Sequence, residues 1–264
     1  MESETSVRTY LLCILLFVVT ALSAAAPAYA AGLCTNPTYT TTQNISFSFG
    51  SGLDNYTVAH DLWNIGPYPD SSWTLQVCNF DSWNELAVAN NNSGDGAVKA
   101  YPNVHRDYNS QPLISSIPLI SVAFAGTAWN SGIYDVAFDI WTRNYQKEIM
   151  IWTENHNQLP GGSRVVSNLS ISGYTWDLWQ SGTSYFAFAS PLDQATGKPQ
   201  NRTIASGTFD VKAFLTYLIA TGKLASNSKL QQLDYGIEVV DTGNVQQTFS
   251  CIQLCDHRPL ILSD

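Results

Sequence analysis

The stretch YDVAFDIW, residues 134–141, alternates in a way that decides the fold of this chain. Successive side chains of a β-strand point to opposite faces of the sheet, so the stretch predicts a strand with two different faces. One face carries apolar side chains suited to a core: Val136, Phe138 and Ile140. The other carries a small, an acidic and an aromatic residue: Ala137, Asp139 and Trp141.

The next apolar run, EIMIW at 148–152, divides in the same way. Ile149 and Ile151 share the core face, and the other face carries Glu148, Met150 and Trp152. The link at 142–147 is short, which predicts an antiparallel hairpin. Glutamate is rarely buried without a partner, so Glu148 is expected either at the rim of a strand or on the floor of a binding cleft.

Further short β-type runs are separated by loops rich in Asn, Gly, Ser and Pro, the pattern of an all-β sandwich. These runs lie at 46–49, 73–78, 119–124, 184–189 and 237–240. One segment differs, because the apolar residues of 209–224 recur at helical spacing, with Asp210 as a cap and Gly222 as a stop. We expect one amphipathic helix packed on the outside of the sheets.

The first thirty residues have the features of an export signal. Arg8 precedes the apolar run 11–19, and small residues follow up to Ala28-Tyr29-Ala30. We expect a signal peptide at 1–30, cleavage after Ala30 and one secreted domain at 31–264. An uncleaved membrane anchor is the alternative, although the apolar run is shorter than the ~20 residues of a membrane span.

Four cysteines remain after Cys13 leaves with the leader, and an even number in an exported chain predicts two disulfides. Pairing by nearest sequence position gives Cys34–Cys78 and Cys251–Cys255. A zinc site is the competing interpretation, but the two pairs lie far apart and no well-spaced histidines accompany them. We expect no metal and no organic cofactor.

The composition limits the classes of molecule that this protein is expected to bind. Charged residues make up 12% of the chain, against a typical ~25%, and the formal net charge is −9. Nucleic acid is therefore not expected as a partner, because phosphate binding needs clustered Lys and Arg. A neutral polymer remains compatible with this surface.

Acids beside tryptophans on the non-core face suggest sugar binding, because sugar rings stack on aromatic rings and carboxylates accept bonds from hydroxyl groups. A third acid, Glu238, lies in the run DYGIEVV, opposite the core-facing Ile237 and Val239. If the strands of Glu148 and Glu238 are close, the two could hydrolyse a glycosidic bond, one as nucleophile or base and one as acid. The alternative is that these are structural carboxylates bound to backbone or Arg.

These residues resemble glycoside hydrolase family 12, whose members are retaining β-1,4-glucanases with a concave jelly-roll sandwich. The likeness runs from about Cys34 to Cys251, and its strongest part is the strand pair YDVAFDIWT and EIMIW. Weaker matches follow in the same order: VKAYPNV at 98–104, LPGG at 159–162, FDVKAFLTYL at 209–218 and GIEVVDTG at 236–243.

The resemblance implies a role for each matching residue. Glu148 would be the nucleophile, Glu238 the acid/base, and Asp139 would orient Glu148 through a shared hydrogen bond. Met150 and Trp152 would line the same floor.

Trp63, in AHDLWN, matches a tryptophan that the family stacks on a donor-side glucose. The sequence departs from the family there, because His60 and Asp61 stand where asparagines are usual.

The sequence thus predicts a secreted, monomeric, retaining endo-β-1,4-glucanase acting on soluble β-glucan, with no stable membrane association after leader cleavage. Two alternatives are a xyloglucan-specific endoglucanase of the same family and a lectin-like sandwich that binds glycans without cutting them.

Overall fold

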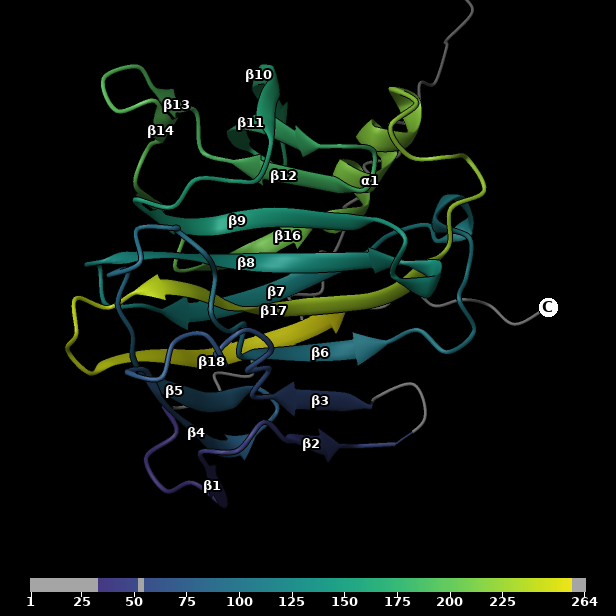
Figure 1. Cartoon of the computed structure of the whole chain (residues 1–264). Coiled ribbons are helices and arrows are strands. Elements are labelled where there is room, and N and C mark those ends of the chain that lie inside the picture. Colours follow the sequence, from purple (N-terminus) through teal and green to yellow (C-terminus); the bar gives the residue numbers. More distant parts are fainter. Residues whose placement is uncertain (1–32, 52–54, 258–264) are drawn as a thin grey trace, which may run out of the picture.

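The chain folds as two packed β-sheets, as a computed structural model shows for residues 33–51 and 55–257 (Figure 1). The predicted signal peptide at 1–30 lies outside the described residues. No helix in the described part of the chain is long and apolar enough to cross a membrane.

The smaller sheet has six strands, in spatial order β1 (Tyr39–Thr41), β4 (Ser72–Asn79), β5 (Ser82–Val88), β18 (Gln247–His257), β7 (Ser121–Thr127) and β16 (Ser206–Asp210). All its pairs are antiparallel.

The larger sheet has ten strands. Nine of them follow one another as β10 (Ser163–Ile171), β11 (Tyr174–Ser181), β12 (Tyr185–Ala189), β9 (Glu148–His156), β8 (Ile133–Thr142), β17 (Leu230–Asp241), β6 (Asn103–Asp107), β3 (Tyr56–Ala59) and β2 (Ser46–Phe49). The tenth, β15 (Arg202–Thr203), pairs with β9. The pair β12 and β9 is parallel, whereas the other neighbours are antiparallel. A separate small ladder joins β13 (Leu192–Asp193) to β14 (Lys198–Pro199).

The core lies between the two sheets and contains the predicted apolar face of the central hairpin. Phe138, Ile140, Ile149 and Ile151 are all 0% exposed. Phe124 of the smaller sheet packs on Phe138 with ring centroids 5.3 Å apart. The alternation in sequence therefore predicted correctly which face packs in the core between the two sheets.

Helix α1 (Val211–Ala220) begins directly after β16, as the spacing predicted. The Asp210 side chain caps it by accepting a hydrogen bond from the Ala213 amide, and Gly222 follows its end with a φ of 71°. Phe214 packs on Trp176 of β11 and Phe188 of β12 at 5.4 and 5.0 Å. The helix thus extends the smaller layer over the inner face of the larger sheet instead of lying outside both sheets.

Of the two predicted disulfides, Cys34–Cys78 is present, with a Cα separation of 5.5 Å. The predicted Cys251–Cys255 bridge is wrong for this structure. Both residues lie in β18, where Cys251 pairs with Gly126 and Cys255 with Ala123. Residues four apart in a strand are separated by about 13 Å, farther than a disulfide can span.

Candidate active site

Three neighbouring strands, β9, β8 and β17, form the floor of a groove on the face of the larger sheet that points away from the core. Strand register places Glu238 opposite Asp135 and Asp234 opposite Asp139. Between these two pairs of carboxyls lie Gly236 and Ala137, which also face each other. These small residues leave room for the segment 101–103 to pack against the sheet between the two acidic rows.

Gly236 is needed at this place by close packing. A Cβ added there would lie 2.2 Å from the Pro102 carbonyl oxygen and 2.7 Å from the Asn103 Cβ. Strand β6 can therefore approach β17 closely only because residue 236 has no side chain. The Tyr101 hydroxyl donates a hydrogen bond to the Ala137 carbonyl, 3.1 Å away.

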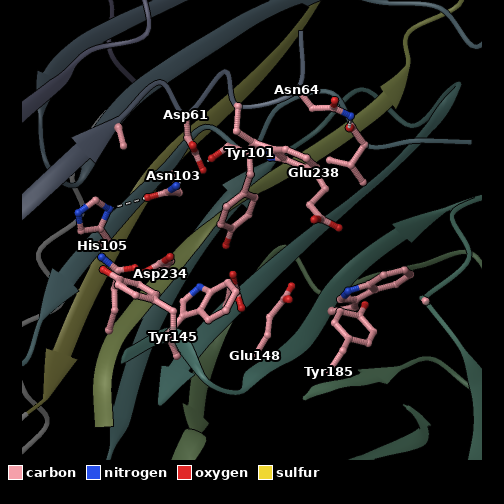
Figure 2. A pocket seen from close by; sticks show the side chains of 18 of the residues that line it. Asp61, Asn64, Tyr101, Asn103, His105, Tyr145, Glu148, Tyr185, Asp234 and Glu238 are labelled. Atoms are coloured by element: carbon pink, nitrogen blue, oxygen red, sulfur yellow. Dashed lines mark hydrogen bonds between the residues drawn. The ribbon is translucent and has the colours of Figure 1, made fainter. Parts of the chain in front are cut away.

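Glu148 lies in the groove at the start of β9, between Trp141 of β8 and Tyr185 of β12. Its side chain and that of Glu238 point toward the same space from opposite sides (Figure 2). Burial, and then the charge of Glu238, raises the pKa of Glu148 to about 7. Glu148 is therefore part of the cleft floor, and the two predicted glutamates meet.

Glu238 interacts most directly with Asp135, its cross-strand partner. Burial raises the pKa of Glu238, a hydrogen bond with Asp135 lowers it, and the charge of Asp61 raises it. Asp135 is 0% exposed, and burial together with Glu238 raises the pKa of Asp135 well above its usual range. Asp135 is thus the protonated member that can donate a hydrogen bond to Glu238.

Asp139 is buried beside both Glu148 and Asp234. Burial first, and then the charge of Glu148, raises the pKa of Asp139 well above its ordinary value, while a hydrogen bond from Trp141 opposes this. The interaction between Asp139 and Glu148 is therefore one of like charges at short range. The predicted shared hydrogen bond would need one of the two to hold a proton.

The groove has a volume of about 870 Å³. Trp63 lines it with 58% of its surface exposed, and Tyr145 does so with 52%. Trp152 is almost completely covered but reaches the floor. Met150 differs from its prediction, because it is buried beneath Tyr185, whose hydroxyl donates to the Met150 sulfur at 3.4 Å.

One side of the groove, away from Tyr185, gathers Asp61, Asn103, His105 and Asp234 (Figure 2). Asp61 has a left-handed backbone with φ of 42°, and burial raises its pKa to about 6. Burial also raises the pKa of Asp234, as do the charges of Asp107 and Asp61.

Sequence reasoning missed Asp135, Asp234, Tyr101 and Tyr185 as residues of this site. A signal existed for Asp135, because it lies four positions before Asp139 on the same face of one strand. The same alternation places Asp234 on the face of Glu238. For Tyr101 and Tyr185 the sequence holds no such signal, since their place depends on which strands become neighbours.

No three His, Cys, Asp or Glu side chains are arranged to hold a metal ion in the part of the chain that the structure describes. In the groove, carboxyl groups that differ in their protonation state lie next to aromatic side chains. Such an arrangement suits proton transfer to, and attack on, a sugar.

Comparison with known proteins gives one family. The model of glycosyl hydrolase family 12 matches residues 54–252. Two proteins of Phytophthora nicotianae (strain INRA-310) are each 24% identical to this chain. The inactive glycoside hydrolase XLP1 matches over 76% of this chain and 86% of its own length. The xyloglucan-specific endo-β-1,4-glucanase 1 matches over 74% and 83%.

Solved structures share the fold. The xyloglucanase domain of NopAA, a type three effector from Sinorhizobium fredii solved with cellobiose, superposes with a TM-score of 0.67 at 22% identity. The match covers 84% of this chain and all of that domain. At this identity the similarity shows a common concave jelly roll.

Proposed function

Because this chain belongs to glycosyl hydrolase family 12, we propose that it is a secreted, retaining endo-β-1,4-glucanase that cuts internal bonds of soluble β-glucans. The observation that carries the proposal is the meeting of Glu148 and Glu238 across one groove, from strands β9 and β17. Family membership alone does not carry it, since one relative bears the name of an inactive hydrolase.

Glu148 is the proposed nucleophile, which forms the bond to the anomeric carbon, and Glu238 the proposed acid that protonates the leaving oxygen. Glu238 then accepts a proton from the water that releases the sugar from Glu148. Each glutamate raises the cost of ionising its neighbour, so the pair loses its protons in two steps. Between those steps the pair holds one proton, and the first reaction step takes place when that proton is on Glu238 and Glu148 is ionised.

Asp139 is the proposed positioning residue of Glu148, and Asp135 that of Glu238. Trp63 offers an exposed aromatic face on which a glucose ring can stack, and Trp152 supports the floor. A polymer can lie across such a groove without presenting an end, which supports internal cleavage. We further propose that the mature protein acts as a monomer after its leader is removed.

Xyloglucan is the second candidate substrate, and the names of the relatives favour it. The curated glucanase from Phytophthora nicotianae is xyloglucan-specific, and the domain from Sinorhizobium fredii is a xyloglucanase. Both candidates share the β-1,4-linked backbone that the groove would bind.

The test is reducing-end release from mixed-linkage β-glucan, carboxymethyl cellulose and xyloglucan by residues 31–264. Glu148→Gln and Glu238→Gln are each expected to lower release by about 10² or more, because each removes a group that acts in the transition state. Glu154→Gln is the matched control, since Glu154 lies in the same strand β9 and accepts a hydrogen bond from Tyr134, outside the groove. It is expected to retain activity within a few fold.

Proton NMR of the first product formed distinguishes retention, which gives the β-anomer, from inversion. No release from any of the three glucans by the unsubstituted protein, with binding retained, would contradict hydrolysis and favour the lectin-like alternative. Circular dichroism of each variant shows whether it is folded.

A further inference from the structure

The side of the groove away from Tyr185 holds more carboxyl groups than the two-glutamate reaction uses. Asp61 and Asp234 both line it, and their charges act on each other. Asp107 lies next to them and accepts a hydrogen bond from Gln232 at 2.8 Å. Among the described residues that line the groove, none is Lys or Arg.

Asp234 is the most unusual of these acids. It is only 4% exposed, yet it lines the groove, and its Oδ1 has no hydrogen-bond partner among the described residues. Its neighbours across the strands are Asp139 and His105. A buried carboxyl oxygen without a hydrogen-bond donor costs free energy. A ligand that donates a hydrogen bond to this oxygen removes that cost and therefore binds more tightly.

His105 does not neutralise this cluster. Its Nδ1 lies 2.8 Å from the Asn103 side-chain oxygen, an acceptor, so Nδ1 carries the hydrogen. Asn103 is fixed in turn by donating to the Tyr101 carbonyl at 2.8 Å. Burial lowers the pKa of His105, although the charge of Asp107 opposes this. The ring is therefore neutral near pH 7.

We propose that Asp61 and Asp234 form an ammonium-binding subsite, through which the groove takes β-1,4-linked chains containing glucosamine. This inference rests on the proposed function, because it assumes that the groove binds a β-1,4-linked sugar backbone. A glucosamine unit differs from glucose in carrying an ammonium group in place of the hydroxyl at C2, so its chain fits the same groove. The ammonium group supplies three N–H donors to two carboxyl groups that have no cationic partner, and its positive charge favours their ionised forms.

The experiment compares three hexasaccharides by isothermal titration calorimetry: cellohexaose, the glucosamine hexamer and the N-acetylglucosamine hexamer. All proteins carry Glu148→Gln to prevent turnover, and the buffer is set above the pKa of Asp61, about 6, so that this carboxyl is ionised. The glucosamine hexamer is expected to bind about tenfold more tightly than cellohexaose, a factor that one charge-assisted hydrogen bond supplies. The acetylated hexamer, which has no charge, is expected to show no such gain.

Added Asp61→Asn or Asp234→Asn should each remove most of the gain while leaving the Kd for cellohexaose within a few fold. Asp70→Asn is the matched control, because Asp70 is exposed, lies outside the groove and changes the net charge equally. Circular dichroism and thermal melting establish that each variant is folded.

Equal Kd values for cellohexaose and the glucosamine hexamer would overturn the subsite but leave the proposed glucanase standing. The subsite would also be overturned if Asp70→Asn reduced the preference for the glucosamine hexamer as much as Asp61→Asn does. That preference would then arise from the net charge of −9. If no hexamer binds and the unsubstituted protein releases no sugar from glucan, the proposed function and the subsite both fail.

Discussion

At the scale of single residues, the site is defined by carboxyls that cannot all ionise together. Glu238 and Asp135 face each other across β17 and β8, as do Asp234 and Asp139. Within each pair the low dielectric makes a second negative charge costly, so a proton is retained well above the ordinary carboxyl pKa. The two carboxyls of each pair therefore differ in protonation state because of where the strands place them.

Glu238→Gln is expected to lower the pKa of Glu148 from its value of about 7. The substitution removes the neighbouring charge, while the burial that also raises this pKa remains. Carbon-13 NMR of labelled glutamate side chains, titrated with pH, measures the change. An unaltered pKa of Glu148 would show that the two carboxyls are too far apart to share a reaction.

Asp135→Ala is expected to move the alkaline limb of the pH–activity profile upward. The hydrogen bond with Asp135 lowers the pKa of Glu238, so its loss raises that pKa, and the acid stays protonated to higher pH. Asp135→Asn keeps a donor and is expected to shift the limb less. The kcat/KM of each variant against pH is the measurement, and a downward shift for Asp135→Ala would contradict the assigned hydrogen bond.

The sequence predicted Glu148 and Glu238 because each interrupts an apolar alternation on the non-core face. It did not predict Asp135 or Asp234, although the same alternation applies to them, because which acids become partners depends on the register between β8 and β17. Register is set by the pairing of whole strands and by irregularities between Leu230 and Gln232 and between Val239 and Asp241, which no local pattern shows.

At the scale of elements, the groove depends on how closely β6 approaches β17. Gly236→Ala is expected to destabilise the fold by about 1–3 kcal/mol and to lower activity at least tenfold, because its Cβ would force β6 away. Urea unfolding and reducing-end release measure the two effects.

Gly207→Ala in β16 is the control for that substitution, since its Cβ would lie 3.6 Å from Phe124, an ordinary contact. It is expected to change stability by less than about 1 kcal/mol. If Gly236→Ala were as mild as this control, the close approach of β6 would not be what shapes the groove.

The sequence predicted which helices and strands are present better than it predicted where each begins and ends. The helix and the central hairpin followed from clear periodicities, and both are present. Strand β17 was predicted only at 237–240 but runs from Leu230 to Asp241. Its first half places polar residues such as Gln232 and Asp234 in the groove, so a hydrophobic pattern could not mark them as part of a strand.

At the scale of the whole molecule, the acidic groove makes stability depend on pH. Asp135, Asp139, Glu148 and Asp234 have raised pKa values, so the folded protein holds protons that the unfolded chain releases above about pH 4. This stabilisation is complete below that pH and is lost as pH rises toward and beyond the pKa of Glu148, about 7.

The melting temperature is therefore expected to fall by roughly 5 °C or more between about pH 5 and about pH 8. The pKa of His60 is raised and acts in the same direction, whereas that of His105 is lowered and opposes it. Differential scanning calorimetry measures the fall, and Asp234→Asn should make it smaller. A melting temperature that rises over this range would show that the groove acids ionise freely.

The position of β18 has a consequence for when this protein can fold. This strand comes last among the described elements, yet it lies between β5 and β7 in the middle of the smaller sheet. The two flanking strands have edges that stay unpaired until β18 has been synthesised. The smaller sheet can therefore close only after every other described strand has been made, so a shorter nascent chain exposes two strand edges that are open to mispairing.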